Sequence, residues 1–269
     1  LSGKALVYVC AVCSSLCSVL LGYDIGVMSG AKEFIRPDLG LSSVQEEVVV
    51  GSLNIVAAFG GLVAGKAADS IGRKPTIALS CAVFISGAGI MTLSTGFVAL
   101  LVGRIITGIG VGCAMVIAPV YITELAPTNI RGMLVSLTDI CINVGILFGY
   151  GSSIACSSVF KGDSTRWRSM VGVGTIPPAL ILACLTLMPE SPRWMISKGR
   201  DREGLAILRR VSEVSLPCLR LFGGGGGRQG SSWMDVLAPR DKKVQAAMLV
   251  GLGLGFWQQA SGSEVREIY

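Results

Sequence analysis

The chain has 269 residues, of which 51% are hydrophobic and only 15% are charged. Soluble domains carry about 25% charged residues, so this composition argues against a soluble enzyme or binding module. The formal net charge of +6 fits a bias of Lys and Arg toward cytoplasmic loops, and no basic stretch with interleaved aromatic residues indicates a nucleic-acid partner. The sequence holds no histidine, which removes His-based zinc sites and hydrolytic triads.

Several apolar stretches approach or exceed about 18 residues, which predicts an all-α, polytopic membrane protein. The predicted spans run, in chain order, over residues 5–28, 48–67, 76–95, 97–121, 133–155, 170–188 and 244–260. A polar segment, Ser29 to Glu47, separates the first two, and Gly96 alone links the third and fourth, which should be antiparallel neighbours. The sequence begins with Leu1, and we expect an upstream tail before the first span.

Three regions are expected. Residues 1–188 form a six-span bundle, residues 189–243 a cytoplasmic helical loop with a Gly-rich linker, and residues 244–269 a seventh span that starts a second bundle. Within the loop, Asp201 to Ser212 has the pattern of an amphipathic helix. The distribution of Lys and Arg among the loops places the N-terminus and the even-numbered loops in the cytoplasm.

The fourth span carries Arg104 close to one end of its apolar run. A charge at that depth costs at least ~2.5–3.5 kcal/mol, so it requires a partner or a water-filled cavity. Four small residues (Gly108, Gly110, Gly112 and Ala114) are expected to leave one side of this helix nearly bare for a close neighbour or a ligand.

Asp24 in the first span is the opposite charge that can pair with Arg104. A low-dielectric site favours a neutral carboxyl group, whereas a nearby guanidinium favours the carboxylate. Opening and closing the contact would therefore change the affinity of Asp24 for a proton, as a proton-coupled carrier requires. A static ion pair that only fixes helix packing is the alternative.

Seven of the nine cysteines lie in apolar spans, where cysteine behaves as a small hydrophobic residue. Cys10, Cys13 and Cys17 share a helix face, and we expect them to pack in the core, since no fourth ligand accompanies them. No metal or other cofactor is predicted. The sequence shows no pair of a nucleophile and a base, so it does not indicate an enzyme.

Several motifs occur together in order. They are GYDIGVMSGA (22–31), GRKP (72–75), GRIITGIGVG (103–112), PVYITELAP (119–127), RG (131–132), PESPRW (189–194) and QQASG (258–262). With these motifs the chain resembles the sugar porters of the major facilitator superfamily. Asp139 on the fifth span and Glu264 after QQASG make it most similar to plant polyol and monosaccharide transporters. The resemblance implies six helices per half and about twelve spans in all.

The resemblance also implies roles for residues. Asp24 and Arg104 would form the proton-coupling pair, and Gln258, Gln259 and Glu264 would contact substrate hydroxyl groups. Asp139 would either accept hydrogen bonds from substrate or act as a second counter-ion of Arg104. A cytoplasmic gating network that latches the two halves would comprise Asp69, Gly72, Arg73, Lys74, Glu124, Arg131, Glu190 and Arg193.

The implied function is proton-coupled symport of a polyol or monosaccharide across a membrane, most simply the plasma membrane. The expected partners are the small-molecule substrate, protons and the lipid bilayer. The chain ends just after the seventh apolar run, so we expect transport to require a missing half, supplied by homo- or hetero-dimerisation. Two alternatives stay open. One is a non-transporting partner that regulates or assembles with a full-length relative, and the other is a facilitative carrier without proton coupling.

Overall fold

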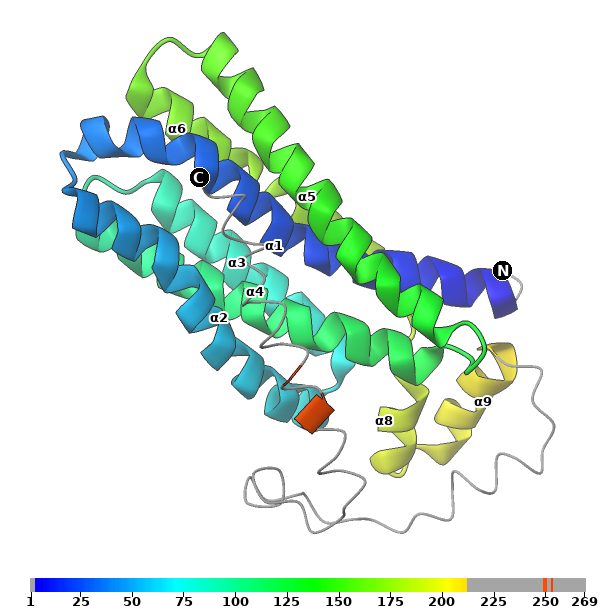
Figure 1. Ribbon diagram of the computed structural model, residues 1–269. Coiled ribbons are helices and arrows are strands. Elements are labelled where there is room, and N and C mark those ends of the chain that lie inside the picture. The colour runs from blue at the N-terminus through cyan, green and yellow to red at the C-terminus, as the bar shows by residue number, and fades with distance from the viewer. Residues whose placement is uncertain (1–2, 212–248, 251–252, 254–269) are drawn as a thin grey trace. The chain divides into compact units, whose positions relative to one another are not determined.

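The computed structural model describes residues 3–211, 249–250 and 253, and the first of these ranges is built from helices (Figure 1). Six of its segments are long and apolar enough to cross a membrane, which confirms the predicted all-α polytopic fold. The first five are α1 (Gly3–Leu39), α2 (Ser43–Ile71), α3 (Arg73–Thr92), α4 (Phe97–Leu125) and α5 (Arg131–Val159). The sixth consists of α6 (Asp163–Val173) and α7 (Ile176–Leu185), and two short helices follow, α8 (Pro192–Ser197) and α9 (Asp201–Val211).

The first helix is longer than the sequence pattern indicates. The predicted end of the first span at Met28 is wrong, because α1 continues to Leu39 with Ala31 and Ile35 buried. The helix ends before Gly40, whose φ of 60° suits a glycine at a helix C-terminus. Ser42 then starts α2 with a capping box, in which its hydroxyl and the Gln45 side chain bond reciprocally to the backbone.

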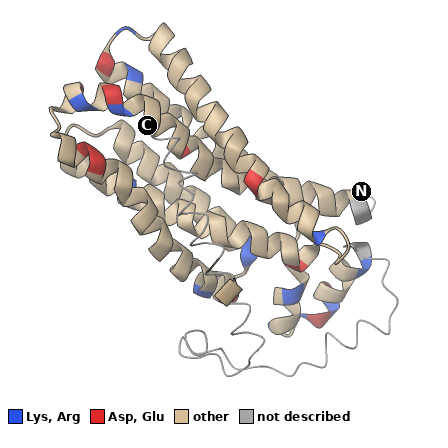
Figure 2. Ribbon diagram, in the orientation of Figure 1, with Lys and Arg blue, Asp and Glu red and all other residues tan. Residues whose placement is uncertain are grey.

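The two helices that carry opposite charges, α1 and α4, lie deepest in the bundle. In each, 61% of the most apolar window is buried, against 22% for α2 and 28% for α5. The most extensive packing joins α1 to α5 and α4 to both α2 and α3, and α3 and α4 are neighbours as predicted. Figure 2 shows most charged residues near the ends of the helices, so the middle of the bundle is almost free of charge.

Close approach of α4 to its neighbours depends on glycine at two sides, and the predicted single bare side is therefore wrong. A Cβ atom at Gly112 would lie 2.0 Å from the carbonyl oxygen of Ala57 on α2. A Cβ atom at Gly110 would lie 2.9 Å from the backbone of Ser80 and Phe84 on α3. The glycines let α4 fit between two helices at backbone contact distance.

The sixth span begins earlier than predicted and is broken in its middle. It starts at Asp163 rather than Met170, and Gly174 and Thr175 interrupt it between α6 and α7. Proline lies in the first turn of α7, where it is tolerated because those N–H groups have no partner within a helix. Gly174 packs against the ring of Tyr23, since a Cβ atom there would lie 2.8 Å from a ring carbon.

The end of the bundle opposite α8 is held by Asp38 at the end of α1. Its carboxylate accepts hydrogen bonds from Trp167 Nε1 at 2.9 Å and from Arg168 Nη1 at 3.0 Å. Arg168 Nη2 also donates to the carbonyl oxygen of Ser94 at 2.7 Å, after α3. These contacts connect α1, α6 and the α3–α4 turn.

Candidate functional site

A single ion pair lies inside the described part of the bundle. Asp24 of α1 is 5% exposed and Arg104 of α4 is 1% exposed. Arg104 Nη1 donates to both carboxylate oxygens of Asp24, at 2.7 and 2.6 Å. Arg104 Nε donates to the carbonyl oxygen of Val49 on α2 at 3.2 Å. The predicted pairing of Asp24 with Arg104 is therefore present, and the arginine connects three helices.

The surroundings of the pair are mostly apolar. A small cavity beside Asp24 is lined by Val27, Phe84, Ala88, Met91, Val171 and other residues of α1, α3, α4 and α6. Removing two charges from water costs several kcal/mol per ion, and a buried pair often stabilises a fold less than well-packed hydrophobic residues would. An intramembrane ion pair is therefore better explained by a function than by stability alone.

One nitrogen atom supplies the hydrogen bonds that hold the carboxylate of Asp24. Among the described residues, both of its hydrogen bonds come from Arg104 Nη1. A small displacement of Arg104 therefore breaks both bonds together.

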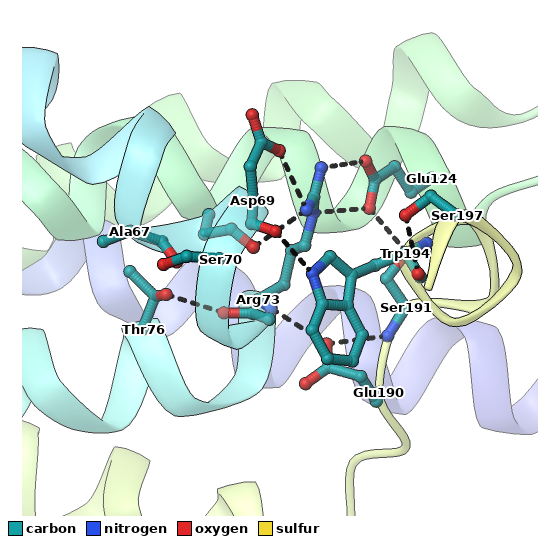
Figure 3. A network of polar contacts seen from close by, with 12 residues as sticks. Ala67, Asp69, Ser70, Arg73, Thr76, Glu124, Glu190, Ser191, Trp194 and Ser197 are labelled. Atoms are coloured by element: carbon teal, nitrogen blue, oxygen red, sulfur yellow. Dashed lines mark hydrogen bonds and ion pairs between the residues drawn. The ribbon is translucent and has the colours of Figure 1, made fainter. Parts of the chain in front are cut away.

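A second polar cluster lies at the end of the bundle that carries α8 (Figure 3). Arg73, the first residue of α3, forms a two-bond ion pair with Glu124 of α4. The Nε–Oε2 distance is 2.9 Å and the Nη2–Oε1 distance is 2.8 Å. Arg73 Nη1 also lies 3.1 Å from Asp69 Oδ1 on α2. The arginine thus joins the ends of α2, α3 and α4.

Glu190, just before α8, caps the N-terminus of α3. Its Oε1 atom accepts backbone N–H bonds from Arg73 at 2.9 Å, from Lys74 at 3.2 Å and from Ser191 at 2.9 Å. The N-cap residue of α3 is Gly72, which has no side chain to do this. A carboxylate at a helix N-terminus satisfies free N–H groups and interacts favourably with the helix dipole.

Gly72 is required at this position for two reasons. Its φ of 106° lies in a region that residues with a Cβ atom rarely adopt. A Cβ atom there would also lie 2.6 Å from Glu190 Oε2. The glycine of the GRKP motif therefore makes room for the acid of the PESPRW motif.

Two residues of this cluster, Ser191 and Trp194, were not predicted from the sequence. The Ser191 hydroxyl donates to Glu124 Oε2 at 2.5 Å, and Trp194 Nε1 donates to the carbonyl oxygen of Asp69 at 3.1 Å. Both belong to the PESPRW motif, and their position close to Glu190 in the sequence could have indicated that they belong to the cluster. Lys74 also joins this end of the bundle, because its Nζ donates to the carbonyl oxygen of Met188 at 2.9 Å.

The remaining predicted network residues lie differently. Arg131 Nη2 donates to the carbonyl oxygen of Ala126 at 3.3 Å, and its buried Nε has no hydrogen-bond partner among the described residues. Arg193 is exposed on α8. The structure brings together Asp69, Gly72, Arg73, Lys74, Glu124 and Glu190, and Arg193 has an interaction partner as well.

Of the predicted substrate contacts, only Asp139 is described. It is exposed on α5, and its carbonyl oxygen accepts a bond from Asn143 Nδ2 at 2.9 Å. The ion pair of Arg104 goes to Asp24, so Asp139 is not its counter-ion here. Gln258, Gln259 and Glu264 lie outside the described residues. The three clustered cysteines, Cys10, Cys13 and Cys17, are buried in the core.

Sequence comparisons relate the chain to membrane transporters. The pattern of a family described as "Sugar (and other) transporter" matches residues 10–269. A protein of Arabidopsis thaliana named probable polyol transporter 4 is 41% identical over 274 residues, which cover 98% of this chain and 51% of the relative. The glucose transporter GlcP of Staphylococcus epidermidis is 38% identical over 206 residues, which cover 77% of this chain and 45% of the relative. The chain spans about half the length of the curated relatives it matches.

Solved structures of membrane transporters also align with the chain. The major facilitator proton:xylose symporter XylE, bound to 6-bromo-6-deoxy-D-glucose, aligns with a TM-score of 0.76 and 27% identity, over 81% of this chain and 53% of that one. XylE from E. coli in a partially occluded inward open conformation aligns with a TM-score of 0.82 and 25% identity, over 98% of this chain and 66% of that one.

Proposed function

The chain belongs to the sugar (and other) transporter family, and we propose that its six-helix bundle forms one wall of a carrier that moves a polyol or monosaccharide together with protons. The relatives named polyol transporters support the substrate class. The proton:xylose symporter with the same fold supports the coupling ion.

The observation that carries this proposal is the buried pair of Asp24 and Arg104. Proton binding at Asp24 removes its negative charge and with it the ion pair that joins α1 to α4. Arg104 then retains its bond to Val49 on α2, so the loss of the pair changes how α1 is held and not how α2 is held. The proton thereby changes helix packing, which can be linked to substrate binding.

Substrate recognition would use the exposed polar face of α5. Asp139 and Asn143 are one helical turn apart there. A carboxylate accepts hydrogen bonds from hydroxyl groups and an amide both donates and accepts, which suits a neutral polyhydroxylated ligand. Gln258, Gln259 and Glu264, on a seventh span within residues 244–269, are proposed to complete the contacts.

We further propose that the α8 end and the N-terminus are cytoplasmic and that the carrier acts in the plasma membrane. The cluster around Arg73 would then be the cytoplasmic gating network. Asp69, whose side chain is 76% exposed, remains available to a second half. In this superfamily the two halves rock against each other around a central site.

The test is uptake of labelled sorbitol, inositol, glucose and xylose by transporter-deficient yeast that expresses the chain, in acidic and in neutral medium. Faster uptake in acidic medium is expected, and Asp24→Asn should abolish that pH dependence. Asp163→Asn changes an exposed aspartate and should leave it intact. Uptake by Asp24→Asn with unchanged proton dependence rejects the coupling role, and uptake that is indifferent to pH supports a facilitative carrier.

A second candidate function rests on the low burial of α2 and on the exposed α5 face of Asp139 and Asn143, which together offer a surface for a second half. In that case the chain assembles with a full-length relative or a second copy and regulates it. This candidate predicts no uptake by the chain alone, together with altered uptake when the relative is co-expressed.

A further inference from the structure

A cavity of about 550 Å³ opens between three spans on one side of the bundle. Its walls are Leu16, Val19 and Tyr23 of α1, an apolar strip of α5, and Ile176, Pro177 and Leu180 of α7. The volume lies within the range of about 300–1,000 Å³ that is typical of ligand pockets. The wall formed by α7 is the second half of the sixth span, which is broken at Gly174 and Thr175.

The cavity lies at the depth of the hydrocarbon core. Its α5 residues fall between Val144 and Ala155, well inside a helix that ends at Val159. Leu147 on one wall is 71% exposed and Leu180 on the other is 58% exposed. Side chains exposed at this depth of a membrane-spanning helix lie within the thickness of the bilayer, so the cavity is a recess in the lateral surface of the described bundle.

The recess is separate from the polar face of α5. At about 100° per residue, Asn143 is displaced from Asp139 by about 40°, whereas the recess residues of α5 are displaced by about 80° (Leu147) to about 180° (Phe148) and are centred near 150°. The recess therefore lies on another side of α5 from the residues proposed to contact the substrate.

The polar groups at the recess are already satisfied. The Tyr23 hydroxyl donates to the carbonyl oxygen of Met170 at 2.7 Å and lies 3.0 Å from Ser152 Oγ. Ser152 in turn donates to the carbonyl oxygen of Gly149 at 2.8 Å. With these bonds made and no charged residue in the lining, the recess favours a hydrocarbon chain over a sugar or a lipid headgroup.

We propose that this recess binds one acyl chain of a membrane phospholipid. An apolar space of this size that stayed empty would lose dispersion contacts along all its walls, and the bilayer supplies acyl chains at that depth. The inner wall of the recess is also part of the surroundings of Asp24. Tyr23 lines both the recess and the small cavity beside Asp24, so its ring contacts both spaces.

The test uses the complete 269-residue chain purified into lipid nanodiscs that contain phosphatidylcholine with a diazirine group on its acyl chain. Adducts are located by mass spectrometry after illumination. We expect labelling of Leu147, Phe148 and Leu180 to exceed labelling of Leu79, an exposed residue of α3, by at least about five-fold, because only the recess retains a lipid. Equal labelling at all four positions overturns the proposal, since it describes ordinary bilayer contact.

Gly151→Leu provides the decisive variant. A Cβ atom at Gly151 meets nothing within 4 Å, so the larger side chain fills the recess without a clash at the backbone. It should reduce labelling of the recess to the level at Leu79, as should Ala155→Leu. Gly89→Leu is the matched control, because Gly89 on α3 also has open space around it and lies outside the recess.

Two further outcomes overturn the proposal. One is strong labelling that persists in Gly151→Leu and Ala155→Leu while both variants remain monodisperse and melt at the temperature of the unaltered chain. The other is displacement of the acyl probe by a sterol diazirine or by contact between two copies of the chain, because the recess would then serve a different occupant.

Discussion

The buried ion pair and the cluster at the α8 end hold carboxylates in different ways. In the pair, one nitrogen of Arg104 supplies both hydrogen bonds to Asp24. In the cluster, Glu124 is bound by two nitrogens of Arg73 and by the hydroxyl of Ser191. Glu190 is bound by three backbone N–H groups.

The two sites differ in how many donor groups each carboxylate has. Loss of a single donor leaves Glu124 and Glu190 with others in place, so the cluster tolerates small movements. The same loss leaves Asp24 with none among the described residues. The comparison predicts a large effect from breaking the pair and graded effects from removing single members of the cluster.

The largest effect is expected from Arg104→Met. Removing one partner of a buried pair leaves an uncompensated charge and should lower the free energy of unfolding by about 3–5 kcal/mol. Asp24→Leu combined with Arg104→Met removes both charges and should recover most of that loss. Unfolding in detergent micelles, followed by circular dichroism, measures both, and a double variant as unstable as the single one contradicts the assignment.

Gly72→Ala should cost about 3 kcal/mol, because the backbone is strained there and the new methyl group meets Glu190. Gly40→Ala is its matched control. Gly40 also has a positive φ, but a Cβ atom there meets nothing within 4 Å, so only backbone strain of about 1 kcal/mol is expected. Equal losses in the two variants would show that the contact with Glu190 adds nothing.

Glu190→Gln keeps the shape of the side chain but removes its charge at the N-terminus of α3. A loss of about 1–2 kcal/mol is expected, from weaker hydrogen bonds and from the helix dipole. The same unfolding assay applies, and Glu33→Gln, at an exposed position of α1, should change stability by less than about 0.5 kcal/mol. A loss no larger than that of Glu33→Gln would place Glu190 outside the cap.

Ser191→Ala is expected to have the smallest effect, about 1 kcal/mol, because it removes the side-chain cap of α8 and one bond to Glu124, which Arg73 still binds. Ser70→Ala removes a hydroxyl whose one hydrogen bond within the described part of the chain is local, to the carbonyl oxygen of Ala67, and should be nearly neutral. A loss above about 3 kcal/mol for Ser191→Ala would contradict the view that the cluster has spare donors.

The sequence predicted the parts of the structure that local patterns encode. Apolar runs predicted the six described spans. The pairing of Asp24 with Arg104 was predicted because an unpaired charge is costly at that depth. The contacts of Asp38 with Trp167 and Arg168 were missed, since polar residues near span ends have many possible partners. Such contacts depend on how distant segments pack, which no local pattern reports.

The errors in helix bounds have the same origin. Residues 29–39 are polar enough to indicate a loop, yet Ala31 and Ile35 are buried by the rest of the bundle. The break at Gly174 was not predicted because glycine also occurs within intact helices of this chain. Family resemblance supplied the cluster residues but gave no geometry, and Ser191 and Trp194 therefore became visible only in the structure.

The packing of α1 on α5, and of α4 between α2 and α3, divides the bundle into two layers. Asp24 belongs to the first layer and Arg104 to the second, so their ion pair crosses the boundary between them. Neutralising Asp24 should therefore speed amide hydrogen–deuterium exchange along that boundary, in the middle of α1 and α4. Exchange at the α3 N-terminus, where Glu190 holds the amides of Arg73 and Lys74, should keep its original rate.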